Sequence, residues 1–285
     1  MGQHADWDIV TGIGATALAV AAARSIETHR PDRLVADPLA AVFVRAARPG
    51  AVMPTGPEDG GDEPMWQAMA TYLGVRSRFF DEYFAQSGVT QAVLLASGLD
   101  LRGYRLDWPD GTSVYELDMP KVLDFKLEVL VDNNAVPTAD VRNVQIDLRD
   151  DWPTALLDAG FDPKRRTAWL AEGLLPFLPE EATVALFSNM HRLSAPGSLI
   201  AAEHIVGDPR EVANDPTFRN MQEEYGLTLE DLWPHDKTYD PAAWLTDNGW
   251  AVTSEYAEKV AERFGRPFGE HLDSFRGNLF LTARR

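Results

Sequence analysis

The pattern of hydrophobic positions along the chain changes near residue 90. In residues 7–29, which contain no proline, apolar residues recur at helical spacing, and residues 38–47 and 65–87 carry the same pattern. Between the last two, residues 48–64 hold four prolines and four glycines, a composition typical of a loop. We therefore expect residues 1–90 to be mainly helical.

Short apolar runs that end in acidic or glycine-bearing turns begin at residue 91. Helical segments follow most of them, which favours an α/β fold with a seven-stranded, mostly parallel sheet and helices on both faces. The seven runs are residues 92–96, 113–117, 141–146, 167–171, 199–205, 251–256 and 278–283.

Residues 207–240 interrupt this alternation with a polar, helix-prone segment. A long insertion in an α/β domain is usually an active-site cover. We therefore expect one domain made of a helical cover (1–90), a core (91–206 and 241–285) and a lid (207–240).

The composition of the chain excludes several classes of partner and of site. Lys and Arg total 26 against 44 Asp and Glu, and the net charge of -18 argues against nucleic acid and anionic membranes as partners. The chain has no cysteine, which excludes disulfides, thiolate metal sites and a cysteine nucleophile. We expect no bound metal. The apolar stretch 15–23 is too short to span a bilayer and has no basic segment before it, so we expect a soluble, cytoplasmic protein.

The first apolar run ends in the turn LLASGLD, residues 94–100. Ligands of parallel sheets bind beyond the carboxyl ends of the strands, where Gly98 would let the backbone pass close to one. Asp118 follows Gly98 by 20 residues, close to the separation at which a carboxylate reaches the ribose of a bound nucleoside. The alternative is that Asp118 caps a helix that begins at Pro120.

Two further candidates follow the third and fourth runs. Asp147 could accept a hydrogen bond from an adenine amino group while Leu148 packs on the ring, although a solvated acidic loop explains Asp147 equally well. Glu172 is a lone carboxylate in an apolar neighbourhood, and a cationic or amine-bearing ligand would give it a partner.

Two arginines, Arg76 and Arg78, lie among aromatic residues upstream. A guanidinium binds a carboxylate bidentately, so either could hold an amino-acid-like tail. The alternative is that both pack along a helix and pair with Asp81 or Glu82. Position in the chain does not choose between the two arginines.

Six motifs carry a resemblance to a known family: DPLA (37–40), RSRFFD (76–81), VLLASGLDLRGYRL (93–106), VYELDMP (114–120), DLR (147–149) and AEGLL (171–175). Together they resemble the leucine carboxyl methyltransferase-like family, in its actinobacterial branch of S-adenosyl-L-methionine-dependent methyltransferases. The likeness covers most of residues 7–204. It implies a Rossmann-like class I methyltransferase fold whose last strand is antiparallel, with extra N-terminal helices and an insertion that cover the site.

The resemblance also implies how S-adenosyl-L-methionine would be held. The expected contacts are Arg76 or Arg78 at the methionine carboxylate, Gly98 along the methionine chain, Asp118 at the ribose, Asp147 and Leu148 at the adenine, and Glu172 near the amino group or the transferred methyl, with Asp100 and Glu116 beside them in the same turns.

The expected activity is methyl transfer to an oxygen of a small molecule, with S-adenosyl-L-homocysteine as product and Glu172 and His204 as catalytic candidates. A carboxylate acceptor needs no general base because it is ionised near neutral pH. A phenol or alcohol would need one, and His204 at the end of the fifth run is the first candidate. The alternative for His204 is a strand-end histidine satisfied by backbone. We expect a monomer or a weak homodimer.

Two other functions stay open from the sequence. A nicotinamide-dependent oxidoreductase would share the spacing from Gly98 to Asp118, but the turn lacks the third glycine and the chain lacks a hydride-transfer set. A non-catalytic S-adenosyl-L-methionine-binding protein would keep the same contacts. The glycine-poor turn favours S-adenosyl-L-methionine, since that nucleoside has no pyrophosphate to cradle.

Overall fold

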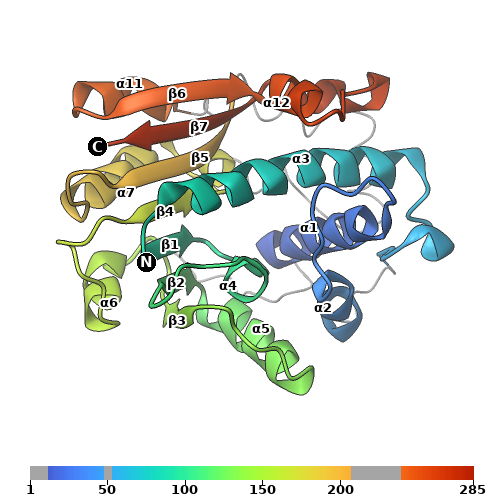
Figure 1. Ribbon diagram of the computed structural model, residues 1–285, viewed down its shortest axis with the longest axis horizontal. Helices are drawn as coiled ribbons and strands as arrows, with labels where there is room; N and C mark the ends of the chain where they lie inside the picture. Colours follow the sequence, from blue (N-terminus) through green and yellow to red (C-terminus); the bar gives the residue numbers. More distant parts are fainter. Residues whose placement is uncertain (1–11, 48–52, 207–238) are drawn as a thin grey trace.

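We describe a computed structural model of the protein over residues 12–47, 53–206 and 239–285. Its centre is a seven-stranded sheet with the order β3-β2-β1-β4-β5-β7-β6 (Figure 1). Strands β1 to β5 pair in parallel, and β7 is antiparallel to both β5 and β6. The strands are β1 (Gln91–Leu95), β2 (Ser113–Asp118), β3 (Asp140–Gln145), β4 (Ala168–Ala171), β5 (Leu199–Ile205), β6 (Ala251–Tyr256) and β7 (Asn278–Arg284). The expected sheet and its antiparallel last strand are confirmed, with strand ends within one residue of the expected runs.

Helices cover both faces of the sheet (Figure 1). One apolar cluster joins α1, α2, α3, α5 and α12 to the first face, and a second joins α6, α7 and α11 to the other. The helices are α1 (Gly12–His29), α2 (Ala40–Ala47), α3 (Pro64–Ser87), α4 (Arg102–Arg105), α5 (Pro120–Asp132), α6 (Trp152–Asp158), α7 (Glu180–Arg192), α11 (Pro241–Asp247) and α12 (Ala257–Arg263), with 3-10 turns η1 (Pro57–Asp59), η2 (Leu175–Phe177) and η3 (Glu270–Phe275). Within the described ranges, no helix is long and apolar enough to cross a membrane.

The described part of residues 1–90 is mainly helical, as expected. The second helix begins at Ala40 instead of residue 38, because the Ala40 N–H closes a turn onto the Asp37 carbonyl at 3.2 Å before the helix starts. Residues 207–238, most of the expected lid, lie outside the described residues, so the lid stays a prediction.

The helix α3 is the longest described and packs against α1 at Gly74. Pro64 begins α3, and Gly88 ends it with a left-handed φ of 60°. A Cβ built on Gly74 would lie 2.7 Å from Cδ of Glu27 in α1. Glu27 cannot easily move aside, because it is buried and accepts hydrogen bonds from the Leu34 N–H and from Arg266. The two helices therefore approach closely only because residue 74 has no side chain.

We expect Gly74→Ala to destabilise the protein by about 1–3 kcal/mol, the usual effect of inserting a methyl group into a packed interior. The measurement is the denaturant midpoint followed by circular dichroism. Gly269→Ala is the matched control, because Gly269 has an ordinary φ of -83° and a Cβ placed on it would have nothing within 4 Å. Equal midpoints for the two variants would contradict the close contact between α1 and α3.

Candidate active site

Polar side chains gather at the carboxyl ends of the strands, on the face that α1 and α3 cover. Glu116 and Asp118 alternate with Val114 along β2, whose side chain belongs to that face's apolar cluster. By the same alternation Glu203 follows Ala201 on β5, and Glu172 follows Leu170 at the end of β4. The fold thus brings carboxylates from separate strands to one edge of one face.

The turn after β1 is anchored by Asp118. Ala96 and Gly98 both have a left-handed φ of 50°, so the chain turns sharply as it leaves the strand. The Gly98 N–H donates to Oδ2 of Asp118 at 2.6 Å, and the Met119 N–H donates to Oδ1 at 2.7 Å. Burial raises the pKa of Asp118. Each carboxylate oxygen retains a second lone pair that can accept from a ligand.

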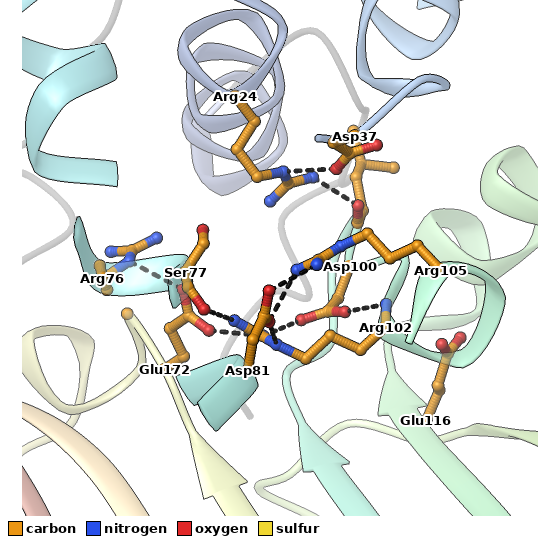
Figure 2. A network of polar contacts seen from close by, with 12 residues as sticks. Arg24, Asp37, Arg76, Ser77, Asp81, Asp100, Arg102, Arg105, Glu116 and Glu172 are labelled. Carbon is orange, nitrogen blue, oxygen red and sulfur yellow. Dashed lines mark hydrogen bonds and ion pairs between the residues drawn. The ribbon is translucent and has the colours of Figure 1, made fainter. Parts of the chain in front are cut away.

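The helix α1 lies over this turn. A Cβ on Gly98 would lie 3.9 Å from that of Ala17, so the two backbones are close. Arg24 of α1 donates to the Leu99 carbonyl at 2.6 Å and pairs with Asp37 at 2.9 Å (Figure 2). Asp37 of the DPLA motif therefore orients Arg24, and Arg24 stabilises the turn after β1.

A fully enclosed guanidinium, Arg102, joins three carboxylates (Figure 2). Its side chain is 2% exposed and pairs with Asp81 at 2.8 Å, with Glu172 at 2.7 Å and with Asp100. Burial raises the pKa of Asp100, but the cations Arg102 and Arg105 outweigh this effect and bring it down to about 2. Arg105 also pairs with Asp81 at 2.6 Å. Arg102 therefore fixes the positions of the Asp100 and Glu172 carboxylates beside the turn after β1.

Arg76 of α3 reaches the same group of side chains. Its Nε lies 2.8 Å from Glu172, and its Nη1 lies 2.9 Å from Glu203. Among the described residues no protein group bonds Nη2, so this nitrogen is free for a ligand. Glu203 in turn accepts from the Tyr72 hydroxyl, from the Gly173 N–H at 2.9 Å and from Asn278.

A family model described as leucine carboxyl methyltransferase matches residues 17–191. The chain belongs to the leucine carboxyl methyltransferase family. Two relatives carry the name "Putative S-adenosyl-L-methionine-dependent methyltransferase". The relative from Mycobacteroides abscessus is 48% identical over 97% of this chain and 96% of its own length. The relative from Saccharopolyspora erythraea is 45% identical over 100% of both chains.

Two solved structures share the fold of this leucine carboxyl methyltransferase family member. A DUF574 family protein from Streptomyces avermitilis has a TM-score of 0.54 at 16% identity, over 86% of this chain and 95% of its own. A "putative methyltransferase" from Thermobifida fusca has a TM-score of 0.53 at 15% identity, over 92% of this chain and 94% of its own. These likenesses bear on the fold alone, and they confirm the class I methyltransferase-like sheet.

The structure separates the two arginines of the family motif RSRFFD. Arg76 is buried among the carboxylates, whereas the Arg78 side chain is 48% exposed and pairs with Glu82 one helical turn away at 2.8 Å. The two side chains point to different sides of α3, and Arg76 is the one that faces the candidate site.

Three other motif residues lie apart from the ion pairs that Arg76 and Arg102 form. Glu116 and Lys126 are both fully buried and pair at 2.7 Å, and burial raises the pKa of Glu116. Asp147 pairs with Arg149 and accepts its backbone N–H at 2.9 Å in the loop after β3. Leu148 packs against the apolar cluster of the other face. Asp147 and Leu148 lie just past the carboxyl end of β3, which pairs with β2, and their assignment to the adenine stays a prediction.

His204 is on the opposite face of the sheet from Glu203. It alternates with Ile200 and Ala202, which belong to the cluster of α7 and α11. The side chain is 4% exposed, and burial lowers its pKa while Asp240 opposes this effect. The structure does not bring the His204 imidazole together with Arg76 and Glu172.

Sequence reasoning missed Tyr72, Arg102 and Glu203 as site residues. Each partners a residue far away in the chain, so no local pattern marks it. Arg102 and Glu172 are 70 residues apart, and Arg76 and Glu203 are 127 residues apart. The one sequence signal was a charged residue in a buried run, which requires a partner without naming it. No group of three or more His, Cys, Asp or Glu that could hold a metal occurs in the ranges that the structure describes.

Proposed function

We propose that this protein is an S-adenosyl-L-methionine-dependent methyltransferase that methylates an oxygen of a small-molecule acceptor. The observation that carries the proposal is the convergence of Gly98, Asp118, Arg76 and Glu172 at the carboxyl ends of β1, β2 and β4. The names of the relatives from Mycobacteroides abscessus and Saccharopolyspora erythraea support S-adenosyl-L-methionine-dependent methyl transfer, and the oxygen acceptor is part of the proposal.

The residues present fit this cofactor in donors and in charge. Arg76 offers the free Nη2 for the methionine carboxylate, and Asp118 offers spare lone pairs for the two ribose hydroxyls. The guanidinium groups of Arg76, Arg102 and Arg105 face four carboxylates, those of Asp81, Asp100, Glu172 and Glu203. This excess of negative charge suits a ligand with an ammonium and a sulfonium group.

The chain's own contribution to the reaction is binding and alignment. When bound, the cofactor supplies an electrophilic methyl group on a sulfonium sulfur. Arg76, Glu172 and Asp118 would fix its two ends, and α1 would exclude water over the turn at Gly98. A carboxylate acceptor would need no proton transfer. An alcohol or phenol would need a general base, and His204, buried on the opposite face of the sheet, is not in a position to act as that base.

The test is isothermal titration calorimetry of the purified protein with S-adenosyl-L-homocysteine, S-adenosyl-L-methionine and NAD. We expect one site per chain for both S-adenosyl compounds and no heat from NAD. Methyl transfer is followed with cofactor labelled in the methyl group and a panel of carboxylic acids, phenols and alcohols. A folded protein that binds neither S-adenosyl compound would refute the proposal, and binding without any transfer would favour a non-catalytic role.

A further inference from the structure

Glu203 on β5 is a buried carboxylate that the proposed function uses only as one of four negative charges. Its Oε2 accepts from Nη1 of Arg76 and from the Gly173 N–H, both at 2.9 Å. Its Oε1 accepts from the Tyr72 hydroxyl, with Asn278 Nδ2 at 3.4 Å. The donors come from α3, from the turn after β4 and from β7, so one carboxylate joins three separate segments.

The surroundings of Glu203 fix it in place. Its side chain is 4% exposed, and a buried carboxylate is tolerated only with several hydrogen bonds or an ion pair. Burial, followed by the charge of Glu203 itself, raises the pKa of Tyr72 well above its usual value, so the phenol remains a donor. Phe275 stacks on the Tyr72 ring with 4.1 Å between centroids and prevents the ring from tilting.

This fixed carboxylate controls which way Arg76 points. A guanidinium is planar, and Nη1 donates its hydrogen bond to Glu203 while Nε has an ion-pair distance to Glu172 but no hydrogen bond, so the bond to Glu203 is the one that sets the direction of the free Nη2. The same Oε2 of Glu203 holds the Gly173 N–H, next in the chain to Glu172, where φ is 64°. Both residues assigned to the amino-acid end of the cofactor are therefore oriented by Glu203.

We propose that Glu203 is a positioning residue that aims Arg76 and Glu172 at the amino-acid end of S-adenosyl-L-methionine. This inference rests on the proposed function, since it takes Arg76 as the ligand of the methionine carboxylate. It assigns Glu203 a role in distinguishing cofactors that have an amino-acid chain from nucleosides that lack one.

The test compares two ligands that differ only in this chain. S-adenosyl-L-homocysteine carries the α-amino and carboxylate groups, and 5′-methylthioadenosine has the same nucleoside and sulfur without them. We expect Glu203→Gln to weaken S-adenosyl-L-homocysteine binding about tenfold, the typical loss for one hydrogen bond to a charged group, and to change 5′-methylthioadenosine binding by less than about twofold. Glu82→Gln is the matched control because it removes a carboxylate whose ion pair, among the described residues, is with the exposed Arg78.

Each outcome decides the role of Glu203. Equal loss for the two ligands would make Glu203 merely structural, and no loss for either would remove it from cofactor recognition. A wild-type protein that binds neither ligand would instead refute the proposed function. A wild-type protein that binds both equally would show that Arg76 does not bind the methionine carboxylate.

If Glu203→Gln does not fold, Tyr72→Phe is used for the same test, because it keeps the Glu203 carboxylate and removes one of its hydrogen-bond donors. We expect that variant to lower the preference for S-adenosyl-L-homocysteine about threefold, and an unchanged preference would overturn the inference.

Discussion

Asp118→Ala is expected to reduce the affinity for S-adenosyl-L-homocysteine by about 100-fold or more, the largest loss of binding that we expect from any single substitution in this chain. Two charge-assisted hydrogen bonds to the ribose hydroxyls are worth about 3 kcal/mol or more together, and every 1.4 kcal/mol is a factor of ten. The alanine variant also leaves the N–H groups of Gly98 and Met119 without their acceptor, which loosens the turn. Calorimetric titration measures the change.

Two comparisons isolate the effect of the carboxylate. Asp110→Ala removes an exposed acidic residue in the loop before β2 and should leave the affinity unchanged. Asp118→Asn keeps one oxygen for the turn but cannot ionise. Because burial raises the pKa of Asp118, the wild-type affinity should begin to fall at a higher pH than an ordinary aspartate would give, and this titration should vanish in the asparagine variant. Full affinity in Asp118→Ala would exclude the ribose assignment.

Arg102→Met should cause the largest loss of stability, about 3–5 kcal/mol, because breaking a buried ion pair leaves uncompensated charge in the interior. The single guanidinium of Arg102 pairs with Asp81, Asp100 and Glu172, whose side chains are 13–14% exposed. The measurement is the free energy of unfolding from denaturant titration at pH 7.

The control for this prediction lies on the surface of α3. Arg78→Met removes an arginine whose ion pair with Glu82 lies at the surface, and exposed pairs are worth about 1 kcal/mol or less. A second comparison uses pH. Asp100 has a pKa lowered to about 2 by its neighbouring arginines, so it contributes stability that is present above its unfolded pKa and is lost as the pH falls toward 2. In Arg102→Met that part of the acid sensitivity should shrink. Similar stability for Arg102→Met and Arg78→Met would contradict the network.

The sequence allowed the sheet to be predicted almost completely, since each strand is a local apolar run bounded by polar turns. The turn at Gly98 and the position of Asp118 were also predictable, because each lies at the end of an apolar run that can be recognised from its neighbouring residues. The choice between Arg76 and Arg78 was not. It depends on how α3 is rotated about its axis, and packing against α1 and the sheet sets that rotation. For a related reason the sequence pointed to His204 and not to its neighbour Glu203. Only the register of β5 in the sheet decides which of these two side chains faces α3.

The position of α3 has a consequence for protein engineering. This one helix supplies Tyr72, Arg76 and Asp81, and their partners lie on α4, in the turn after β4 and on β5. An α3 segment transplanted from a relative would keep these contacts only if it carries the same three side chains. Chimeras within the family should therefore tolerate exchange of residues outside α3 more readily than exchange of α3 itself, unless α4, β5 and the turn after β4 are exchanged with it.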